Sequence, residues 1–147
     1  MSEYLNNFGI VLESADDRQG GNDNKKTESA NYAELSSRLH RYGLETAWLR
    51  NDWDGADFVA FHPDPAKHFM LWVQLKGRLT IERKYEKKGD LCIAFPHNSE
   101  WYVVPHKKLL SIVPQSWLQS VSWVEKGWYS SDAPSKDTIS KLSPYKI

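Results

Sequence analysis

The spacing of apolar residues predicts an amphipathic helix near the start of the chain. Residues 31–42, NYAELSSRLHRY, place Leu35, Leu39 and Tyr42 at spacings of four and three, which gives one apolar stripe on a helix. Gly43 follows at the position where glycine commonly ends a helix. We therefore expect this helix to pack one face against a hydrophobic core.

Short apolar runs after this helix predict strands, because residues that favour turns separate them. The expected strands are residues 44–50, 57–61, 69–77, 91–96 and 101–105. Residues 106–113 predict a short helix or a turn that leads into a last strand, and a further helix is expected around residues 135–142. A helix, then strands, then a helical end is the order of an α+β protein.

The chain has 147 residues, a length that suits one domain with its own core. We expect residues 1–30 to form a short N-terminal helix, within residues 3–13, followed by a mobile polar loop. Residues 31–114 are the expected core. Residues 115–147, which are rich in aromatic side chains, are expected to pack on this core as a C-terminal tail.

Charge is balanced over the whole chain but not along it. The sequence has 19 basic and 19 acidic residues, so the net charge gives no indication of nucleic acid binding. Basic residues gather in segment 76–88, KGRLTIERKYEKK, whereas acidic residues gather at 13–17 and 52–64. This distribution fits either a basic stripe beside an acidic site or an ordinary solvated face.

The single cysteine, Cys92, lies in the apolar run LCIAF, where a thiol is a poor nucleophile. One buried thiol favours a reducing compartment and argues against a disulfide scaffold. No stretch of about 18 apolar residues is present, and the first residues lack the basic and apolar regions of a signal peptide. We expect a cytoplasmic protein with no membrane partner.

The third expected strand ends with polar residues, Gln74 and Lys76, and the strand expected to form a hairpin with it offers a reason for them. If the hairpin turns about the Pro65–Ala66 peptide, Asp57 lies opposite Gln74, and strand alternation puts Lys76 on the same face as Gln74. A shift of one residue would move the pair to the other face. With the expected register, a carboxylate, an amide and an ammonium meet at one end of the hairpin.

Such a group suits a divalent cation bound through oxygen. Mg²⁺ takes a few protein oxygens and keeps water or phosphate oxygens for the rest. Asp57 and Gln74 would supply side-chain oxygens, and the backbone carbonyl of Leu75 would supply another. Lys76 would orient an attacking water and stabilise negative charge on a phosphate.

The pattern of Asp57, sixteen intervening residues and then Gln74-Leu75-Lys76 resembles the core of the PD-(D/E)xK nuclease superfamily. GAD stands where the first motif of the superfamily often has proline and aspartate, and VQLKGR stands at the second motif in its glutamine variant. WYVVPHKKLL is similar to the segment after the core in group I intron-associated endonucleases. The resemblance covers roughly residues 31–110. It implies a restriction-endonuclease-like core with a mixed central sheet of about four to five strands flanked by helices.

The resemblance also implies roles for individual residues. Asp57 and Gln74 would bind Mg²⁺ (or Mn²⁺), and Lys76 would be the catalytic lysine. Glu34 would join them from the first helix, or else be an ordinary solvent-facing residue. The partner would be DNA, and a homodimer is a further expectation because many such nucleases cut two strands as symmetric dimers. Glu82-x-Lys84 has similar spacing, but it lies in a highly charged segment and ranks below Gln74-x-Lys76.

Basic and aromatic side chains near this site suit nucleic acid. Phosphate contacts supply affinity without reading sequence. The residues expected to make them are Arg78, Arg83, Lys84, Lys87 and Lys88. The tail aromatics are Trp117, Trp123, Trp128 and Tyr129. They would either pack onto the sheet or stack on unpaired bases.

Three functions are compatible with these features. The first is a metal-dependent DNA endonuclease from a mobile-element, repair or defence system. The second is a catalytically inactive module of the same fold that binds nucleic acid or a protein partner, because Gln74 replaces a carboxylate and lowers the charge available to hold a cation. The third is a small interaction protein, such as an inhibitor or immunity factor, with the aromatic tail as its interface.

Overall fold

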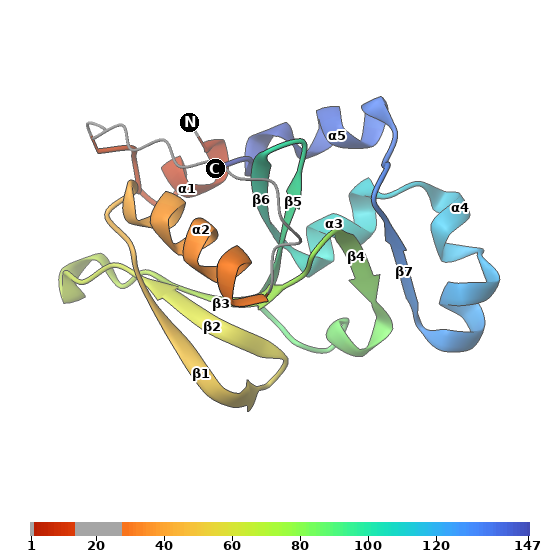
Figure 1. Cartoon of the computed structure of the whole chain (residues 1–147), viewed down its shortest axis with the longest axis horizontal. Helices are drawn as coiled ribbons and strands as arrows, with labels where there is room; N and C mark the ends of the chain where they lie inside the picture. The colour runs from red at the N-terminus through yellow and green to blue at the C-terminus, as the bar shows by residue number, and fades with distance from the viewer. Residues whose placement is uncertain (1, 14–27) are drawn as a thin grey trace.

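A computed structural model of the chain describes residues 2–13 and 28–147. Most of the polar loop predicted within residues 1–30 lies outside these ranges. The centre of the molecule is a five-stranded sheet with strand order β1-β2-β3-β5-β6 (Figure 1). Its strands are β1 (Glu45–Trp53), β2 (Ala56–Phe61), β3 (Met70–Leu75), β5 (Leu91–His97) and β6 (Glu100–Pro105). The protein is therefore α+β with a mixed sheet flanked by helices, as predicted.

The sheet is mixed because one of its neighbouring pairs is parallel. β3 and β5 run parallel, whereas β1–β2, β2–β3 and β5–β6 are antiparallel. A parallel pair needs a long connection. Here the connection contains the short strand β4 (Leu79–Glu82) and the 3₁₀ helix η2 (Arg83–Tyr85). This crossover brings β4 and η2 next to the end of β3.

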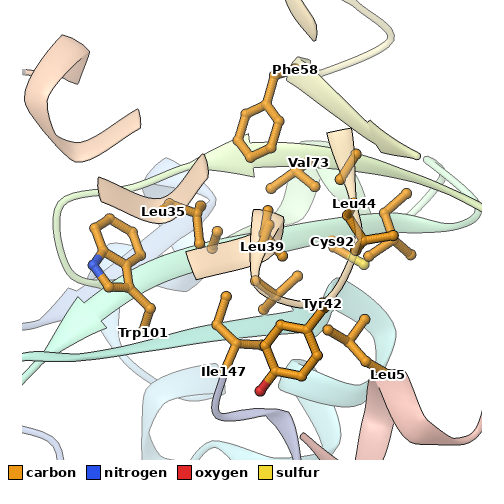
Figure 2. Packing of buried hydrophobic residues seen from close by; sticks show 14 of the residues in the cluster. Leu5, Leu35, Leu39, Tyr42, Leu44, Phe58, Val73, Cys92, Trp101 and Ile147 are labelled. Carbon is orange, nitrogen blue, oxygen red and sulfur yellow. The ribbon is translucent and has the colours of Figure 1, made fainter. Parts of the chain in front are cut away.

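Helices α1 (Glu3–Asn6) and α2 (Glu28–His40) cover one face of the sheet. Leu35 and Leu39 of α2 pack in one buried cluster with Val73 and Cys92 of the sheet (Figure 2). This stripe on α2 is the one that the helical spacing predicted, although the helix begins three residues earlier. The observed helix α1 is shorter than the predicted range 3–13.

A second buried cluster fills the other face of the sheet. Strand alternation sends Cys92 and Ala94 toward α2, and Ile93 and Phe95 toward this second cluster. The elements on that side are β4, α3 (His106–Ile112), α4 (Gln115–Leu118), a π-helical turn η3 (Ser122–Lys126), β7 (Trp128–Ser131), α5 (Lys136–Leu142) and η4 (Ser143–Tyr145). Both faces of β5 are thus buried, which explains its continuous apolar sequence.

The C-terminal tail forms a small sheet of its own with the crossover. β7 pairs antiparallel with β4, and the register sets Ile81 opposite Tyr129 and Glu82 opposite Trp128. Neither β4 nor this pairing was predicted. The helix expected around residues 135–142 is present as α5, and the side chain of Ser135 accepts a hydrogen bond from the Thr138 amide at 3.2 Å.

The β1–β2 hairpin turns through Asp54 and Gly55, which leads the chain directly to the candidate site. Trp53 pairs with Ala56, so the loop has two residues, and both have positive φ, 51° and 90°. This is the backbone of the type I′ turn that Asp-Gly favours. The positive φ of Gly55 favours glycine, and a Cβ there would also lie 3.2 Å from the ring of Tyr85, a close contact that the ring would have to relieve.

Within the described ranges, no helix has the length and apolar character needed to cross a lipid bilayer.

Candidate functional site

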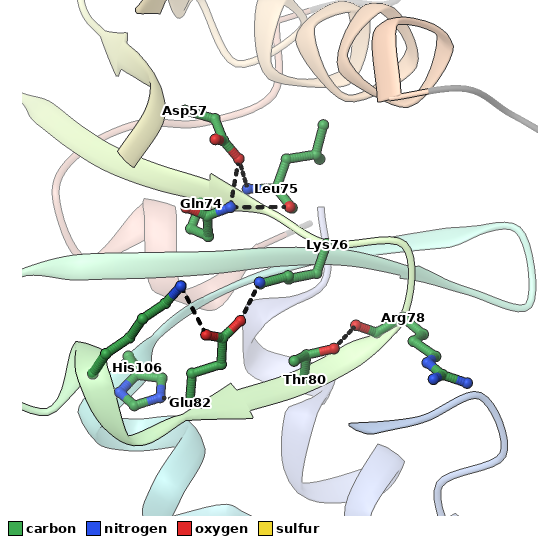
Figure 3. A network of polar contacts seen from close by, with 9 residues as sticks. Asp57, Gln74, Leu75, Lys76, Arg78, Thr80, Glu82 and His106 are labelled. Atoms are coloured by element: carbon green, nitrogen blue, oxygen red, sulfur yellow. Dashed lines mark hydrogen bonds and ion pairs between the residues drawn. The ribbon is translucent and has the colours of Figure 1, made fainter. Parts of the chain in front are cut away.

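The β2–β3 hairpin has the register that the sequence predicted. Phe58 pairs with Val73, and one residue further along the strands Asp57 faces Gln74. Oδ2 of Asp57 accepts a hydrogen bond from Nε2 of Gln74 at 2.7 Å and another from the backbone N–H of Leu75 at 2.8 Å (Figure 3). The structure therefore brings together Asp57, Gln74 and Leu75, three of the residues predicted for the site.

Asp57 is a buried carboxylate, with 8% of its surface exposed. A buried carboxylate is costly unless hydrogen bonds replace its hydration. The Leu75 amide does this from the β3 backbone, and the Gln74 side chain adds a second donor. The carboxylate is consequently held in one place by the strand next to it, which is the rigidity that a ligand or catalytic group needs.

The amide of Gln74 presents nitrogen, not oxygen, to Asp57. Its Nε2 lies 2.7 Å from Asp57 Oδ2 and 3.4 Å from the carbonyl oxygen of Leu75, so both contacts use the same NH₂ group. The assignment follows from hydrogen bonding, since an amide oxygen facing the carboxylate would be repelled. A cation shared by Asp57 and Gln74 would require the amide to turn and direct Oε1 toward it.

With that rotation, the donor atoms at this point would be of the type that Mg²⁺ or Mn²⁺ prefers. They are the carboxylate of Asp57, the amide oxygen of Gln74 and the carbonyl of Leu75, all hard oxygen donors. One carboxylate and two neutral oxygens leave room for water or phosphate oxygens. Across residues 2–13 and 28–147, however, no three His, Cys, Asp or Glu side chains gather as a metal-binding group.

Lys76 points from the end of β3 toward β4. Its Nζ donates to Oε1 of Glu82, and Nζ of Lys84 lies 3.0 Å from the other oxygen, Oε2 (Figure 3). The side chains of Lys76 and Glu82 are 21% and 17% exposed, so this ion pair is largely removed from water. Lys84 is the solvent-exposed member of the group.

The charge of Glu82 is maintained by these two ammonium groups. Burial alone would raise the pKa of Glu82, but hydrogen bonds from Lys76 and Lys84 outweigh burial and hold the pKa below its usual range. Glu82 is therefore ionised at neutral pH. From the sequence, Glu82-x-Lys84 was a lower-ranked alternative to Gln74-x-Lys76. In the structure the two motifs are neighbours, because Lys76 of one forms an ion pair with Glu82 of the other.

His106 and Tyr85 contact the residues of the Lys76–Glu82–Lys84 cluster. The backbone N–H of Glu82 donates to Nε2 of His106 at 3.3 Å, which fixes Nε2 as an acceptor and places the ring proton on Nδ1. Burial lowers the pKa of His106 to about 4, despite the charge of Glu82, so the ring is neutral. The rings of Tyr85 and His106 pack edge to face, with their centres 5.5 Å apart. The Nζ atoms of Lys76 and Lys84 lie over the Tyr85 ring, 5.6 and 5.1 Å from its centre.

These supporting residues were missed because their chemistry depends on distant parts of the chain. His106 begins α3, and its contact with Glu82 spans 24 positions. The one signal for Glu82 was its spacing to Lys84, which does not indicate Lys76 as a partner. Glu34, the site residue predicted on the helix, lies on α2, and its carboxylate is 3.8 Å from the guanidinium of Arg38.

The predicted phosphate-binding residues have different surroundings. Arg83 donates from Nη2 to the carbonyls of Trp123 and Val124, the latter at 3.2 Å, and its guanidinium lies 5.4 Å from the centre of the Trp123 ring. Lys88 forms an ion pair with Asp54. Arg78, Lys84 and Lys87 are exposed. A role in binding nucleic acid stays a prediction for all five.

The chain matches no protein-family model and no curated protein. The function is therefore inferred from the chemistry of the site.

Proposed function

We propose that the protein is a metal-dependent DNA endonuclease that hydrolyses phosphodiester bonds. The observation that carries this proposal is the contact between Asp57 and Gln74, at 2.7 Å, at the end of a hairpin whose next residues are Leu75 and Lys76. The proposal is also supported by the residue types at this strand end, a carboxylate, an amide and a lysine, because the resemblance to the PD-(D/E)xK superfamily implies the same types there. The site also lies beside the basic segment 76–88.

Asp57, Gln74 and the carbonyl of Leu75 would hold Mg²⁺ or Mn²⁺. When bound, the ion would polarise the scissile phosphate and make a coordinated water more acidic. The Leu75 amide would keep the Asp57 carboxylate in position, because it donates to the same oxygen as Gln74. Gln74 would change its hydrogen bonding on metal binding, and Asp57 would not need to move.

Lys76 would stabilise the negative charge that develops on the phosphate. Its ammonium is positioned by Glu82, which also holds Lys84. A phosphate that enters the site would compete with Glu82 for Lys76, so Lys84 would remain to neutralise the carboxylate. The second ammonium on Glu82 therefore allows Lys76 to turn toward the substrate without leaving a partly buried charge unpaired.

Cleavage of supercoiled, linear, nicked and branched DNA with Mg²⁺ or Mn²⁺ tests the proposal. Lys76→Ala should reduce the rate by about 100-fold or more, as expected for loss of a group that stabilises transition-state charge. Lys141→Ala, which removes an exposed lysine paired with Asp137 on α5, is the matched control and should retain the rate. Equal cleavage by the wild type and Lys76→Ala would reject the assignment.

A second candidate is a catalytically inactive module of the same fold that binds nucleic acid or a protein partner. It is favoured by the internal pairing of the site, since Gln74 already satisfies Asp57 and Glu82 already satisfies Lys76. Isothermal titration with Mn²⁺ separates the two candidates. No metal binding at millimolar concentration, with and without DNA, would favour the module.

A further inference from the structure

The four aromatic residues of the C-terminal tail have different environments. Trp117 and Trp123 are buried in the second cluster, and Tyr129 stacks on Trp117 with ring centres 4.5 Å apart. Trp128 is 42% exposed. Packing therefore explains the first three residues, and Trp128 is the most exposed of the four.

Trp128 lines a groove of about 500 Å³ next to the candidate site. Lys126, Gly127 and Trp128 form one side, and residues of segment 82–87 form the other. The lining includes four basic and two acidic side chains, and one of the acidic ones, Glu82, is already paired with Lys76 and Lys84. Lys87, Lys126 and Glu86 form no ion pair within residues 2–13 and 28–147, and the basic side chains outnumber the acidic ones, so the charge of the groove favours an anionic ligand.

The groove is built on a fixed frame. Glu82 and Trp128 are opposite each other in the β4–β7 ladder, and the backbone N–H of Arg83 donates to the carbonyl of Gly127 at 2.7 Å. The guanidinium of Arg83 adds hydrogen bonds to the carbonyls of Trp123 and Val124 within η3. Arg83 is thus a positioning residue that holds the Trp128 side of the groove against the Glu82 side.

Glu82 connects the groove to the proposed reaction centre. Its carboxylate lines the groove and pairs with Lys76. A strand whose phosphate lies at Lys76 would therefore continue past Lys84 into the groove. Phosphates would be neutralised by Lys87 and Lys126, and the next chemical feature that the strand meets is the exposed indole of Trp128.

We propose that this groove binds a single-stranded stretch of DNA, with an unpaired base stacked on Trp128. Both faces of a base inside a duplex are already stacked, so an indole at the groove wall selects bases that are free of a partner strand. This inference rests on the proposed function and narrows it. The substrate class is DNA with an unpaired segment beside the cleavage point, such as a single strand, an overhang or a flap.

Fluorescence anisotropy with labelled single-stranded and blunt duplex oligonucleotides of equal length, without metal, tests the groove. Trp128→Ala should weaken single-strand binding by roughly tenfold or more, the loss expected for one stacked base, and should weaken duplex binding less. Trp128→Phe keeps an aromatic face and should retain most of the affinity. Trp48→Ala is the matched control, because Trp48 is 43% exposed but lies on β1 and not in the groove.

A double variant, Lys87→Ala with Lys126→Ala, should lower the affinity for single strands and reduce the slope of log affinity against log salt by about one to two. Thermal unfolding of each variant shows whether it is folded. Equal single-strand affinity of Trp128→Ala and the wild type, or tighter binding of the duplex by the wild type, would overturn the proposal.

Cleavage measured with the same oligonucleotides distinguishes this inference from the proposed function. Single-strand binding that depends on Trp128, without cleavage in Mg²⁺ or Mn²⁺, supports the groove and rejects the nuclease. Cleavage that depends on Lys76, with no difference between Trp128→Ala and the wild type on any substrate, retains the nuclease and overturns the groove.

Discussion

Gln74 donates its side-chain amide to the carboxylate of Asp57 at 2.7 Å, and the same carboxylate oxygen accepts the backbone N–H of Leu75 at 2.8 Å. The pair is therefore self-satisfied in the absence of a cation. A second carboxylate in place of Gln74 would leave the pair unsatisfied, because two anions at this distance repel each other. The identity of residue 74 consequently decides whether the end of this hairpin carries one negative charge or two.

Gln74→Glu should make the protein dependent on a divalent cation for part of its stability. Without metal, the free energy of unfolding should fall by roughly 2–4 kcal/mol, from charge repulsion and the lost hydrogen bond. Mn²⁺ should restore it, since two carboxylates bind the ion more tightly than one. Thermal unfolding with EDTA and with millimolar Mn²⁺ measures both effects.

The control for this experiment is Gln74→Leu, which removes the amide without adding charge. It should also destabilise the hairpin end, but Mn²⁺ should shift its unfolding temperature less than that of Gln74→Glu. If Mn²⁺ shifts both variants equally, Asp57 and residue 74 do not share a cation.

Glu82→Gln should show that the ion pair with Lys76 is more than a surface contact. Removing the carboxylate charge leaves a largely buried ammonium without its partner, and the free energy of unfolding should fall by about 1–3 kcal/mol. Asp137→Asn breaks the exposed pair with Lys141 and should cost less than about 0.5 kcal/mol. Urea unfolding at fixed pH and salt compares the two variants. Equal losses in the free energy of unfolding would show that the Lys76–Glu82 pair contributes no more than an exposed ion pair.

The main strands and the Asp57–Gln74 pair could be predicted because local chemistry determines them. Pro65 lies in the turn between β2 and β3, and apolar residues on either side fix which faces are buried. Once the turn is placed, the partner of Asp57 follows by counting. The same reasoning found the α2 stripe, since Leu35 and Leu39 need only a helical repeat to share a face.

The β4–β7 sheet could not be found in this way. β4 has only four residues, and its apolar Leu79 and Ile81 are followed by a run of charges, so the segment resembles a solvated stripe. Its partner β7 lies more than forty residues further along the chain and has no alternating pattern. The contacts of Glu82 with Lys76 and His106 depend on this pairing and on the crossover. The part of the site around Glu82 therefore depends on packing between segments that are distant in the sequence.

Gly55→Ala should destabilise the protein through the turn that precedes Asp57. An alanine at φ 90° is strained, and its Cβ would lie 3.2 Å from the ring of Tyr85, which supports Lys76 and Lys84. We expect a loss of about 2 kcal/mol or more in the free energy of unfolding. Gly89→Ala is a useful comparison, because Gly89 has positive φ, 49°, but no atom within 4 Å of the added Cβ.

Backbone strain is the one cost expected for Gly89→Ala, so this variant should lose less stability than Gly55→Ala. If chemical denaturation gives the same loss for both glycines, the close approach of Tyr85 to the turn contributes nothing. A larger loss at Gly55 is the expected result, because its φ of 90° is more strained for alanine than the 49° of Gly89 and its Cβ also approaches the Tyr85 ring.

His106 should make the protein sensitive to mild acid. Burial lowers its pKa to about 4 from an ordinary value of 6.5, so the folded protein binds this proton less readily than the unfolded chain. The free energy of unfolding is therefore unaffected by this group above pH 6.5, and it decreases as the pH falls from 6.5 toward 4, because the unfolded chain takes up the proton first. Between pH 7 and pH 5 the loss should be about 2 kcal/mol.

The pH window separates His106 from its neighbour Glu82. The pKa of Glu82 is lowered, so its contribution is present above its ordinary value of 4.5 and is lost only as the pH falls through the folded-state pKa. His106→Gln keeps an oxygen that accepts the Glu82 N–H but has no titrating ring. Urea unfolding at pH 7 and pH 5 should show a smaller decrease for this variant, by about 2 kcal/mol, and the groups common to both proteins cancel in the comparison. If the two proteins lose the same stability, the ring of His106 is not held neutral by the fold, and the hydrogen bond from Glu82 to Nε2 does not persist in solution.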